Sequence, residues 1–306
     1  MSVDSKHSRR EFVALLSALG ASQFAASGAW AQQSMPRRRI PGTNEWLPII
    51  GLGSSKVISE IAANGAGPVD AILRALVEHG GSVIDTWPRN PANDSAFGAL
   101  INQPHLRDKL FITTKVSENG QAGVQQLEQS LKSYGRKTID LAQIYSLTDL
   151  NTHWPTLKEW KASGKARYIG VTVSEYRLYD QIEAFIRREK PDFVQYNYSV
   201  SERRAEERML PLAQDRGIAV IINRPFMNGD LFKRLANAPV PAWAKEIGIH
   251  TWAEFSLKYI LPHPAITSVV TETSRAVHIV ENARASFGAM PDEATRKRMA
   301  AYMDQV

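Results

Sequence analysis

The chain contains 306 residues, of which 43% are hydrophobic and 22% are charged. This composition is typical of a globular protein and excludes the disordered and fibrous classes. The net charge is +6, but the basic residues are scattered apart from Arg37-Arg38-Arg39, which argues against nucleic-acid binding. The absence of cysteine excludes disulfides, thiolate nucleophiles and cysteine-ligated metals. No set of His, Asp and Glu residues has the spacing of metal ligands, so we expect no metal.

The beginning of the chain has the three parts of an export signal. Lys6, Arg9 and Arg10 form a charged region, residues 12–26 are apolar but rich in small side chains, and Ala29-Trp30-Ala31 is a cleavage site of the small-x-small type. Arg9 and Arg10 lie within the stretch SRREF, which resembles the twin-arginine export motif.

These features predict a twin-arginine signal peptide at residues 1–31 and one mature domain at residues 32–306. A periplasmic or other extracytoplasmic location follows from such a signal. An amphipathic N-terminal helix and an uncleaved membrane anchor are the alternatives, but Ser, Gly and Gln interrupt the apolar run. No other segment is predicted to span a membrane, so none remains after cleavage.

After residue 47, short apolar runs alternate with helical patterns. The runs are apolar on both faces, as strands are in a parallel sheet that helices cover. The predicted strands are 48–53, 82–85, 110–115, 138–145, 168–172, 193–197, 218–223 and 266–271. Eight strand–helix units predict an α/β fold, the closed (β/α)8 or TIM barrel. A doubly wound open sheet is the alternative, but the Gly-x-Gly-x-x-Gly sequence expected after its first strand is missing.

Helical patterns separate the strands. The clearest are 69–78, about 93–101 and 121–134, and the first and third are each followed by glycine. A short helix is expected within 239–248, before the last unit, and a C-terminal helix within 291–303 is expected to close the bottom or edge of the barrel.

An acid, an amine and a phenol end three consecutive predicted strands. They are Asp85, Lys115 and Tyr145. The C-terminal strand ends form the working face of a barrel, and neighbouring strands lie about 5 Å apart, so we expect these side chains to converge. A lysine beside a carboxylate keeps its charge and can polarise a hydroxyl group. The alternative is a structural Asp–Lys pair that caps the barrel.

With these residues identified, the predicted mature chain resembles the aldo-keto reductase superfamily over nearly its whole length. The most specific match is the stretch GKARYIGVT at residues 164–172. The other matching stretches are Gly51-Leu52-Gly53, Ile84-Asp85-Thr86, Asn93-Asp94, Phe97-Gly98, Thr113-Thr114-Lys115, Asp140-Leu141, Gln143-Ile144, Gln195 with Tyr198, Asn223-Arg224-Pro225-Phe226 with Gly229, and Thr273-Ser274-Arg275 through Glu281-Asn282.

The resemblance implies hydride transfer between a nicotinamide cofactor and a carbonyl or alcohol substrate. In the family a tyrosine donates the proton, a lysine held by an aspartate lowers the pKa of that tyrosine, and a histidine orients the carbonyl. Asp85 and Lys115 match two of these positions. Asn90 stands where the tyrosine is expected, and Tyr145 stands where the histidine is expected.

These departures leave two interpretations. In the first, Tyr145 is the acid, Lys115 lowers its pKa from about 10, and Asn90 donates a hydrogen bond to the carbonyl oxygen. We then expect Asp85, Lys115, Tyr145 and Asn90 to surround the reacting carbon. In the second, the barrel has lost reduction and binds a small ligand or a protein partner, because a reductase without its acid loses about 10²–10⁴-fold in rate.

The resemblance also implies the cofactor contacts. Thr172 and Gln195 match the contacts to the nicotinamide carboxamide, although Val173 replaces an expected asparagine. Asn223 or Arg224 stands where the family has an aromatic residue that stacks on the cofactor. The other expected contacts, at the adenosine end, are Thr273, Ser274, Arg275, His278, Glu281 and Asn282.

Glu272 departs from the Gly or Lys that the family has at this position. A carboxylate repels the 2′-phosphate of NADPH, whereas it can accept a hydrogen bond from the free 2′-hydroxyl of NADH. Arg275 favours the phosphate. NADP is therefore the expected cofactor, with NAD as the alternative.

Three further side chains lie near the predicted site in the sequence. Trp87 and Trp154 follow the second and fourth predicted strands, where they could wall a substrate pocket or pack within their loops. His153 could turn into the site, but a place at a helix start or in solvent is favoured. The sequence predicts neither the particular substrate nor the oligomeric state.

Overall fold

Eight parallel strands close into a barrel in the order β10-β3-β4-β5-β6-β7-β8-β9. This confirms the predicted (β/α)8 class. The strands are β3 (Ile50–Leu52), β4 (Val83–Asp85), β5 (Phe111–Val116), β6 (Ile139–Tyr145), β7 (Ala166–Thr172), β8 (Phe193–Asn197), β9 (Ala219–Asn223) and β10 (Ile266–Thr271). Nearly every strand residue is buried, because helices cover the outer faces and side chains fill the interior.

The computed structural model describes residues 35–53 and 56–306. The export signal predicted at residues 1–31 lies outside the described residues. Met35–Val306 form one compact unit. Within the described part of the chain, no helix is long and apolar enough to cross a membrane.

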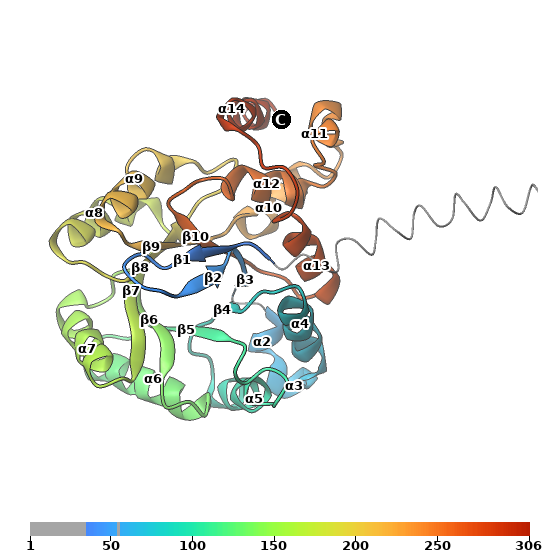
Figure 1. The fold of residues 1–306 in the computed structure, drawn as a ribbon. Helices are drawn as coiled ribbons and strands as arrows, with labels where there is room; N and C mark the ends of the chain where they lie inside the picture. Colours follow the sequence, from blue (N-terminus) through green and yellow to red (C-terminus); the bar gives the residue numbers. More distant parts are fainter. Residues whose placement is uncertain (1–34, 54–55) are drawn as a thin grey trace, which may run out of the picture. The chain divides into compact units, whose positions relative to one another are not determined.

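Helices surround the barrel on its outside (Figure 1). The longer ones are α4 (Gly67–Glu78), α5 (Pro91–Ile101), α6 (Gly120–Ser133), α7 (Leu150–Ala162), α8 (Tyr179–Arg188), α9 (Met209–Arg216), α12 (Trp252–Ile260), α13 (Ala276–Arg284) and α14 (Glu293–Met303). The shorter ones are α2 (Lys56–Ser59), α3 (Ile61–Asn64), α10 (Asp230–Arg234), α11 (Ala242–Glu246), and the 3-10 turns η2 (Tyr176–Leu178), η3 (Arg204–Glu206) and η4 (Met227–Gly229). The predicted short helix and C-terminal helix correspond to α11 and α14.

A hairpin that the sequence analysis did not predict closes the N-terminal end of the barrel. Its antiparallel strands are β1 (Arg37–Arg39) and β2 (Trp46–Pro48), which lie across the ring of strands in Figure 1. Ile40 and Leu47 of the hairpin pack in one cluster with interior residues at the beginnings of the strands. Those interior residues include Val83, Phe111, Phe193 and Ala219.

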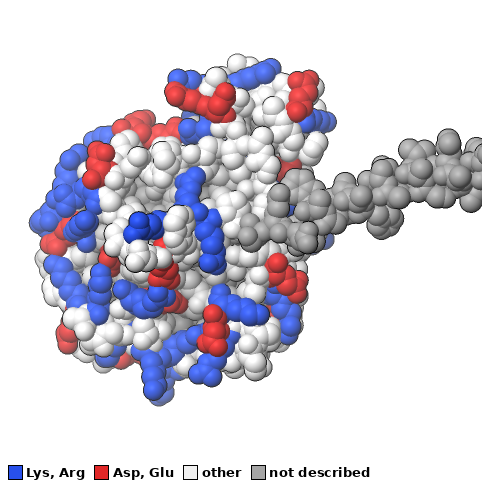
Figure 2. Space-filling model, viewed as in Figure 1, with Lys and Arg blue, Asp and Glu red and all other residues white. Residues whose placement is uncertain are grey.

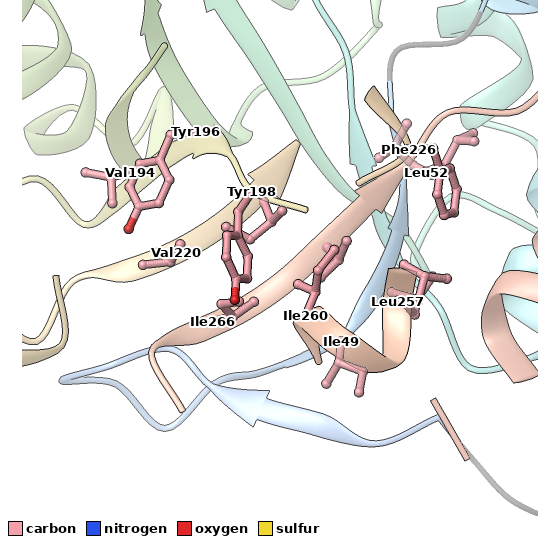
Figure 3. Packing of buried hydrophobic residues seen from close by; sticks show 14 of the residues in the cluster. Ile49, Leu52, Val194, Tyr196, Tyr198, Val220, Phe226, Leu257, Ile260 and Ile266 are labelled. Atoms are coloured by element: carbon pink, nitrogen blue, oxygen red, sulfur yellow. The ribbon is translucent and has the colours of Figure 1, made fainter. Parts of the chain in front are cut away.

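A larger cluster packs the outer faces of the strands against the helices. Figure 3 shows part of it, with Val194 and Val220 on neighbouring strands and Leu257 and Ile260 on α12. On the surface, basic and acidic side chains are interspersed over the face that Figure 2 presents.

The alternation of side chains along each strand decides what reaches the opposite, C-terminal end. Val83 and Phe111 point into the interior. Residues two or four positions further along a strand point the same way. Asp85 and Lys115 therefore also point inward, and so does Tyr145 on β6, where Leu141 belongs to the interior cluster.

Candidate active site

A buried ion pair lies where β4 and β5 end. Lys115 Nζ is 2.6 Å from Asp85 Oδ1, and only 6% of Lys115 and 4% of Asp85 is exposed. Lys115 also donates to the Thr86 carbonyl over 2.9 Å. The predicted contact between the two residues is therefore present. Neighbouring strands bring them together because Asp85 pairs in register with Thr113, two residues before Lys115.

Two further donors satisfy the Asp85 carboxylate. Thr113 Oγ1 donates to Oδ1 over 2.7 Å, and Gln195 Nε2 reaches across from β8 to donate to Oδ2 over 3.0 Å. A buried carboxylate is tolerated only when opposite charge and hydrogen bonds replace its water. Asp85 has both, so it can hold Lys115 in one place.

Tyr145 ends β6 beside this pair and is half-buried. Its ring centroid lies 6.3 Å from that of Trp87, at an interplanar angle of 54°. The Trp87 side chain is 42% exposed, so these two rings form an aromatic wall that borders solvent at the strand ends. The sequence left Trp87 either as the wall of a substrate pocket or as loop packing, and its part in a pocket stays a prediction. Within the described residues, no hydrogen bond reaches the Tyr145 hydroxyl.

Asn90 has a structural contact that the sequence analysis missed. It is the N-cap residue of α5, and its Oδ1 accepts a hydrogen bond from the Asn93 backbone N–H over 2.9 Å. Pro91 follows at the first helical position, which favours a helix start here. The Asn90 side chain is exposed, and only its Nδ2 group remains to donate to a ligand. Its role toward a carbonyl oxygen stays a prediction.

Arg89 brings a second basic group to the site, and sequence analysis did not single it out. It donates to Ser59 Oγ over 2.8 Å and also to Thr86 Oγ1, the residue whose carbonyl accepts from Lys115. Burial lowers the pKa of Arg89, and nearby acids including Asp85 oppose that shift. The sequence could have indicated Arg89, because this arginine lies in the loop after the strand that ends in Asp85.

Amide side chains gather near the C-terminal strand ends with unpaired oxygens. Gln143 and Gln195 are almost fully buried, and Asn197 is 4% exposed. In the described structure, no hydrogen bond reaches the side-chain oxygens of these three residues or of Asn223. An unpaired buried acceptor costs about 1–3 kcal/mol, which favours a ligand that brings N–H or O–H donors. The amide of a nicotinamide ring is such a donor, so Gln195 and the buried Thr172 fit the predicted cofactor contact.

The predicted adenosine contacts gather where α13 begins. Thr273 Oγ1 accepts from the Arg275 backbone N–H over 3.1 Å and lies 3.0 Å from His278 Nδ1, while the Ser274 side chain is exposed. A helix N-terminus with basic side chains suits a phosphate group. Glu281 lies further along α13 and is half-buried.

Two predicted cofactor residues also make contacts within the protein. Asn282 is buried and donates to Thr271 Oγ1 over 3.0 Å, which ties α13 to β10. Arg224 follows β9 with φ of 50°, an uncommon conformation for a residue with a side chain, and donates to the Ser174 carbonyl over 3.2 Å. Their roles toward a cofactor remain predictions.

Glu272 extends beyond the end of β10. Its side chain reaches solvent, yet surrounding protein desolvates it enough to raise its pKa above the usual range. Arg89 and Arg224 act in the opposite direction, since each lowers the pKa of this carboxyl group. The carboxylate therefore interacts with both arginines of the site.

Of the expectations for two nearby residues, that for Trp154 is wrong and the helix-start place of His153 is confirmed. Trp154 does not wall a pocket, because it lies on α7, is buried, donates to Glu189 Oε2 over 2.8 Å and packs edge-on against Phe185 of α8. His153 does not turn into the site, and it lies near the start of α7, one of the two places that the sequence favoured. It is fully buried, with Nε2 at 2.7 Å from the Glu118 carbonyl oxygen.

The fold and the site together define a (β/α)8-barrel protein with a polar site at the C-terminal strand ends, where enzymes of this architecture carry their catalytic groups. The chain belongs to the Aldo/keto reductase family, whose model matches residues 50–299. This confirms the family that the sequence motifs indicated.

Individual relatives are distant in sequence. The NADH-specific methylglyoxal reductase of Escherichia coli (strain K12) is 29% identical over 262 residues, which are 73% of this chain and 78% of that protein. An aldo-keto reductase from Klebsiella pneumoniae in complex with NADPH has a TM-score of 0.74 at 22% identity, over 88% of this chain and 95% of that one. The holo form of an aldo-keto reductase from Bacillus halodurans has a TM-score of 0.70 at 20% identity, over 87% and 96%. The two structures establish the likeness of the fold.

Proposed function

We propose that the protein is an NAD(P)H-dependent oxidoreductase of the aldo-keto reductase type, acting on a small carbonyl or alcohol substrate. The observation that carries this proposal is the buried Lys115–Asp85 pair at the strand ends, with Tyr145 at the end of the next strand. Membership of the family supports the reaction class. The relatives named for NADH and NADPH support a nicotinamide cofactor and leave both forms as candidates.

In this proposal Tyr145 is the general acid. The chemistry that a reduced nicotinamide would supply, when bound near Gln195 and Thr172, is hydride delivery to the carbonyl carbon. Tyr145 gives its phenolic proton to the carbonyl oxygen, and the alcohol forms as the phenol becomes phenolate. The Lys115 ammonium has one N–H beyond its contacts to Asp85 and Thr86, and its charge stabilises the phenolate. Asn90 Nδ2 is proposed to donate to the same oxygen.

A second candidate is a barrel that binds a small ligand or a protein partner without reducing it. Two observations favour it. The Asn90 oxygen is used to cap α5, and no hydrogen bond joins the Tyr145 hydroxyl to any described residue. The two candidates differ in their need for the dinucleotide: an oxidoreductase must bind it, whereas a ligand-binding barrel need not.

Titration of the purified protein with NADPH and NADH, followed by quenching of tryptophan fluorescence, is the first test. We expect saturable binding in the micromolar range or tighter, and reduction of a probe carbonyl such as methylglyoxal. Tyr145→Phe should then lower kcat by about 10²–10⁴-fold while the cofactor Kd stays unchanged. Absence of dinucleotide binding would favour the ligand-binding barrel, and full activity in Tyr145→Phe would exclude Tyr145 as the acid.

The sequence of residues 1–31 supports an extracytoplasmic location for this activity. Replacing Arg9 and Arg10 by lysine should retain the full-length chain in the cytoplasm, because the twin-arginine pair is the feature that its export route reads. Fractionation of cells that express both forms tests this. Periplasmic accumulation of the lysine variant would contradict the proposed route.

A further inference from the structure

The loop that follows Tyr145 has an unusual backbone. Ser146, Leu147 and Asp149 all have left-handed φ values, of 50°, 57° and 43°. Each such residue costs about 1–3 kcal/mol and persists only where its surroundings hold it. The loop 146–149 therefore needs contacts that compensate for this strain.

Two hydrogen bonds tie this loop and the start of α7 to residues 117–120, which form the loop after β5 and the first residue of α6. Asp149 Oδ2 accepts from the Gly120 backbone N–H over 2.8 Å. His153, in the first turns of α7, has Nε2 at 2.7 Å from the Glu118 carbonyl oxygen. The strand ends that carry the proposed acid and its lysine are thus joined a second time, beyond the barrel.

The imidazole of His153 fits a space that a glycine leaves. A Cβ atom at Gly123 on α6 would lie 2.4 Å from His153 Cε1 and 2.3 Å from the Glu118 carbonyl oxygen. Both distances are shorter than a van der Waals contact, so a side chain at position 123 would collide with the ring and with the backbone. His153 is fully buried, and its Nδ1 has no partner within the described residues. Since a carbonyl oxygen only accepts, Nε2 is the nitrogen that donates in this contact.

The loop connects directly to Tyr145. The Thr148 backbone N–H donates to the Tyr145 carbonyl over 3.0 Å, and the Ser146 N–H donates to the Thr172 carbonyl over 2.8 Å. A shift of the loop must therefore move the backbone of Tyr145 or break these bonds.

We propose that His153 and Asp149 are positioning residues, which hold the loop after Tyr145 against the loop after Lys115 and so fix the phenol relative to the ammonium. This rests on the proposed function of Tyr145 as the acid. Neither residue touches the reacting atoms, so their effect is on the placement of the phenol.

Amide hydrogen exchange on the full-length protein tests the tie without any assay of activity. His153→Ala should raise exchange of residues 117–120 and 146–150 at least tenfold, while the cores of β5 and β6 stay protected. His153→Gln keeps an N–H donor for Glu118 and should restore part of the protection. Gly123→Ala should act like His153→Ala, because the added methyl group displaces the ring. Trp154→Phe, next in sequence but packed on α8, is the matched control and should leave both loops unchanged.

Measurements of kcat test whether the tie between the loops positions Tyr145. In His153→Ala and Asp149→Ala we expect kcat to fall at least tenfold with the NADPH or NADH Kd unchanged, and His153→Gln to recover part of kcat. Unchanged exchange in His153→Ala would overturn the tie, and wild-type kcat with raised exchange would overturn the positioning role. If Tyr145→Phe is fully active, the proposed acid fails while the exchange data still decide whether the loops are tied.

Discussion

Lys115 Nζ lies 2.6 Å from Asp85 Oδ1, and both side chains are more than nine-tenths buried. Burial makes the two residues interdependent. Either charge alone would remain in a largely dry environment, where an uncompensated ion is strongly unfavourable. Loss of one partner should therefore affect both the stability of the fold and the proposed chemistry. Variants can separate the effect on stability from the effect on activity.

Lys115→Met should lower the free energy of unfolding by about 3–5 kcal/mol, because it leaves the Asp85 carboxylate buried without its cation. Asp85→Asn together with Lys115→Met should recover part of that loss while activity stays absent. Lys297→Met is the matched control, since its 2.6 Å pair with Glu293 is 76% exposed on both sides and should contribute under about 1 kcal/mol. Urea denaturation measures all three, and equal losses in the two single variants would contradict the argument.

Asn90 allows capping and catalysis to be distinguished. Asn90→Ala removes the acceptor for the Asn93 N–H and should cost about 1 kcal/mol of stability. Asn90→Ser keeps an acceptor for the helix but has no amide N–H. If Nδ2 donates to the carbonyl oxygen in the transition state, both variants should lose kcat, by up to about 10²–10³-fold. Unfolding curves and kcat values for the alanine and serine variants distinguish the two roles. Wild-type kcat in Asn90→Ser would show that Asn90 only caps the helix.

The eight barrel strands could be predicted because strands buried on both faces are continuous apolar runs in the sequence. The hairpin β1–β2 could not. Its first strand is Arg37-Arg38-Arg39, which has no apolar alternation, and it is stabilised by contacts with residues more than two hundred positions away.

The candidate site also contains features that the sequence could predict and features that it could not. The Asp85–Lys115 contact follows from strand ends, because parallel neighbours place equivalent positions side by side. The cap at Asn90 and the buried ring of His153 depend on local backbone geometry and on an absent side chain at Gly123, which no spacing rule contains. Trp154 was misjudged because a residue after a strand end can already belong to the next helix, as it does in α7.

Glu272 should weaken binding of the more highly charged cofactor. Replacing it by glutamine removes a carboxylate near the expected phosphate position, a repulsion of about 1 kcal/mol for charges near a solvated surface. We expect Glu272→Gln to tighten NADPH binding about fivefold and to change NADH binding less. Fluorescence titration of both dinucleotides measures the ratio, and a uniform change for both would argue against a role in discrimination.

The same carboxyl group predicts a pH dependence. Desolvation raises the pKa of Glu272, although Arg89 and Arg224 lower it in part. The charged form repels the phosphate, so the repulsion is present above this pKa and is lost as the pH falls through it. The ratio of wild-type to Glu272→Gln affinity for NADPH should therefore approach one at acidic pH. A ratio that stays constant with pH would show that the carboxylate lies too far from the phosphate to act.

Arg38 should hold the β1–β2 hairpin against the N-terminal end of the barrel. Its guanidinium donates to the carbonyls of Leu261 and His263, each over 2.5 Å, and also to that of Ile266. Burial lowers the pKa of Arg38, but an arginine stays charged in proteins, so these remain charge-assisted hydrogen bonds. Arg38→Ala would leave three carbonyls without this donor and loosen the hairpin.

We expect Arg38→Ala to lower the free energy of unfolding by about 2–4 kcal/mol, since bonds to a charged donor contribute about 1.5–3 kcal/mol each and do not add fully. Arg38→Lys should recover less than half, because one ammonium group cannot replace a fork that reaches three acceptors. Arg37→Ala is the control: Arg37 is exposed on the same strand and should change stability by less than about 0.5 kcal/mol. Urea denaturation with the three variants tests this, and equal effects of Arg37 and Arg38 would mean that other contacts, such as the packing of Ile40 and Leu47, hold the hairpin.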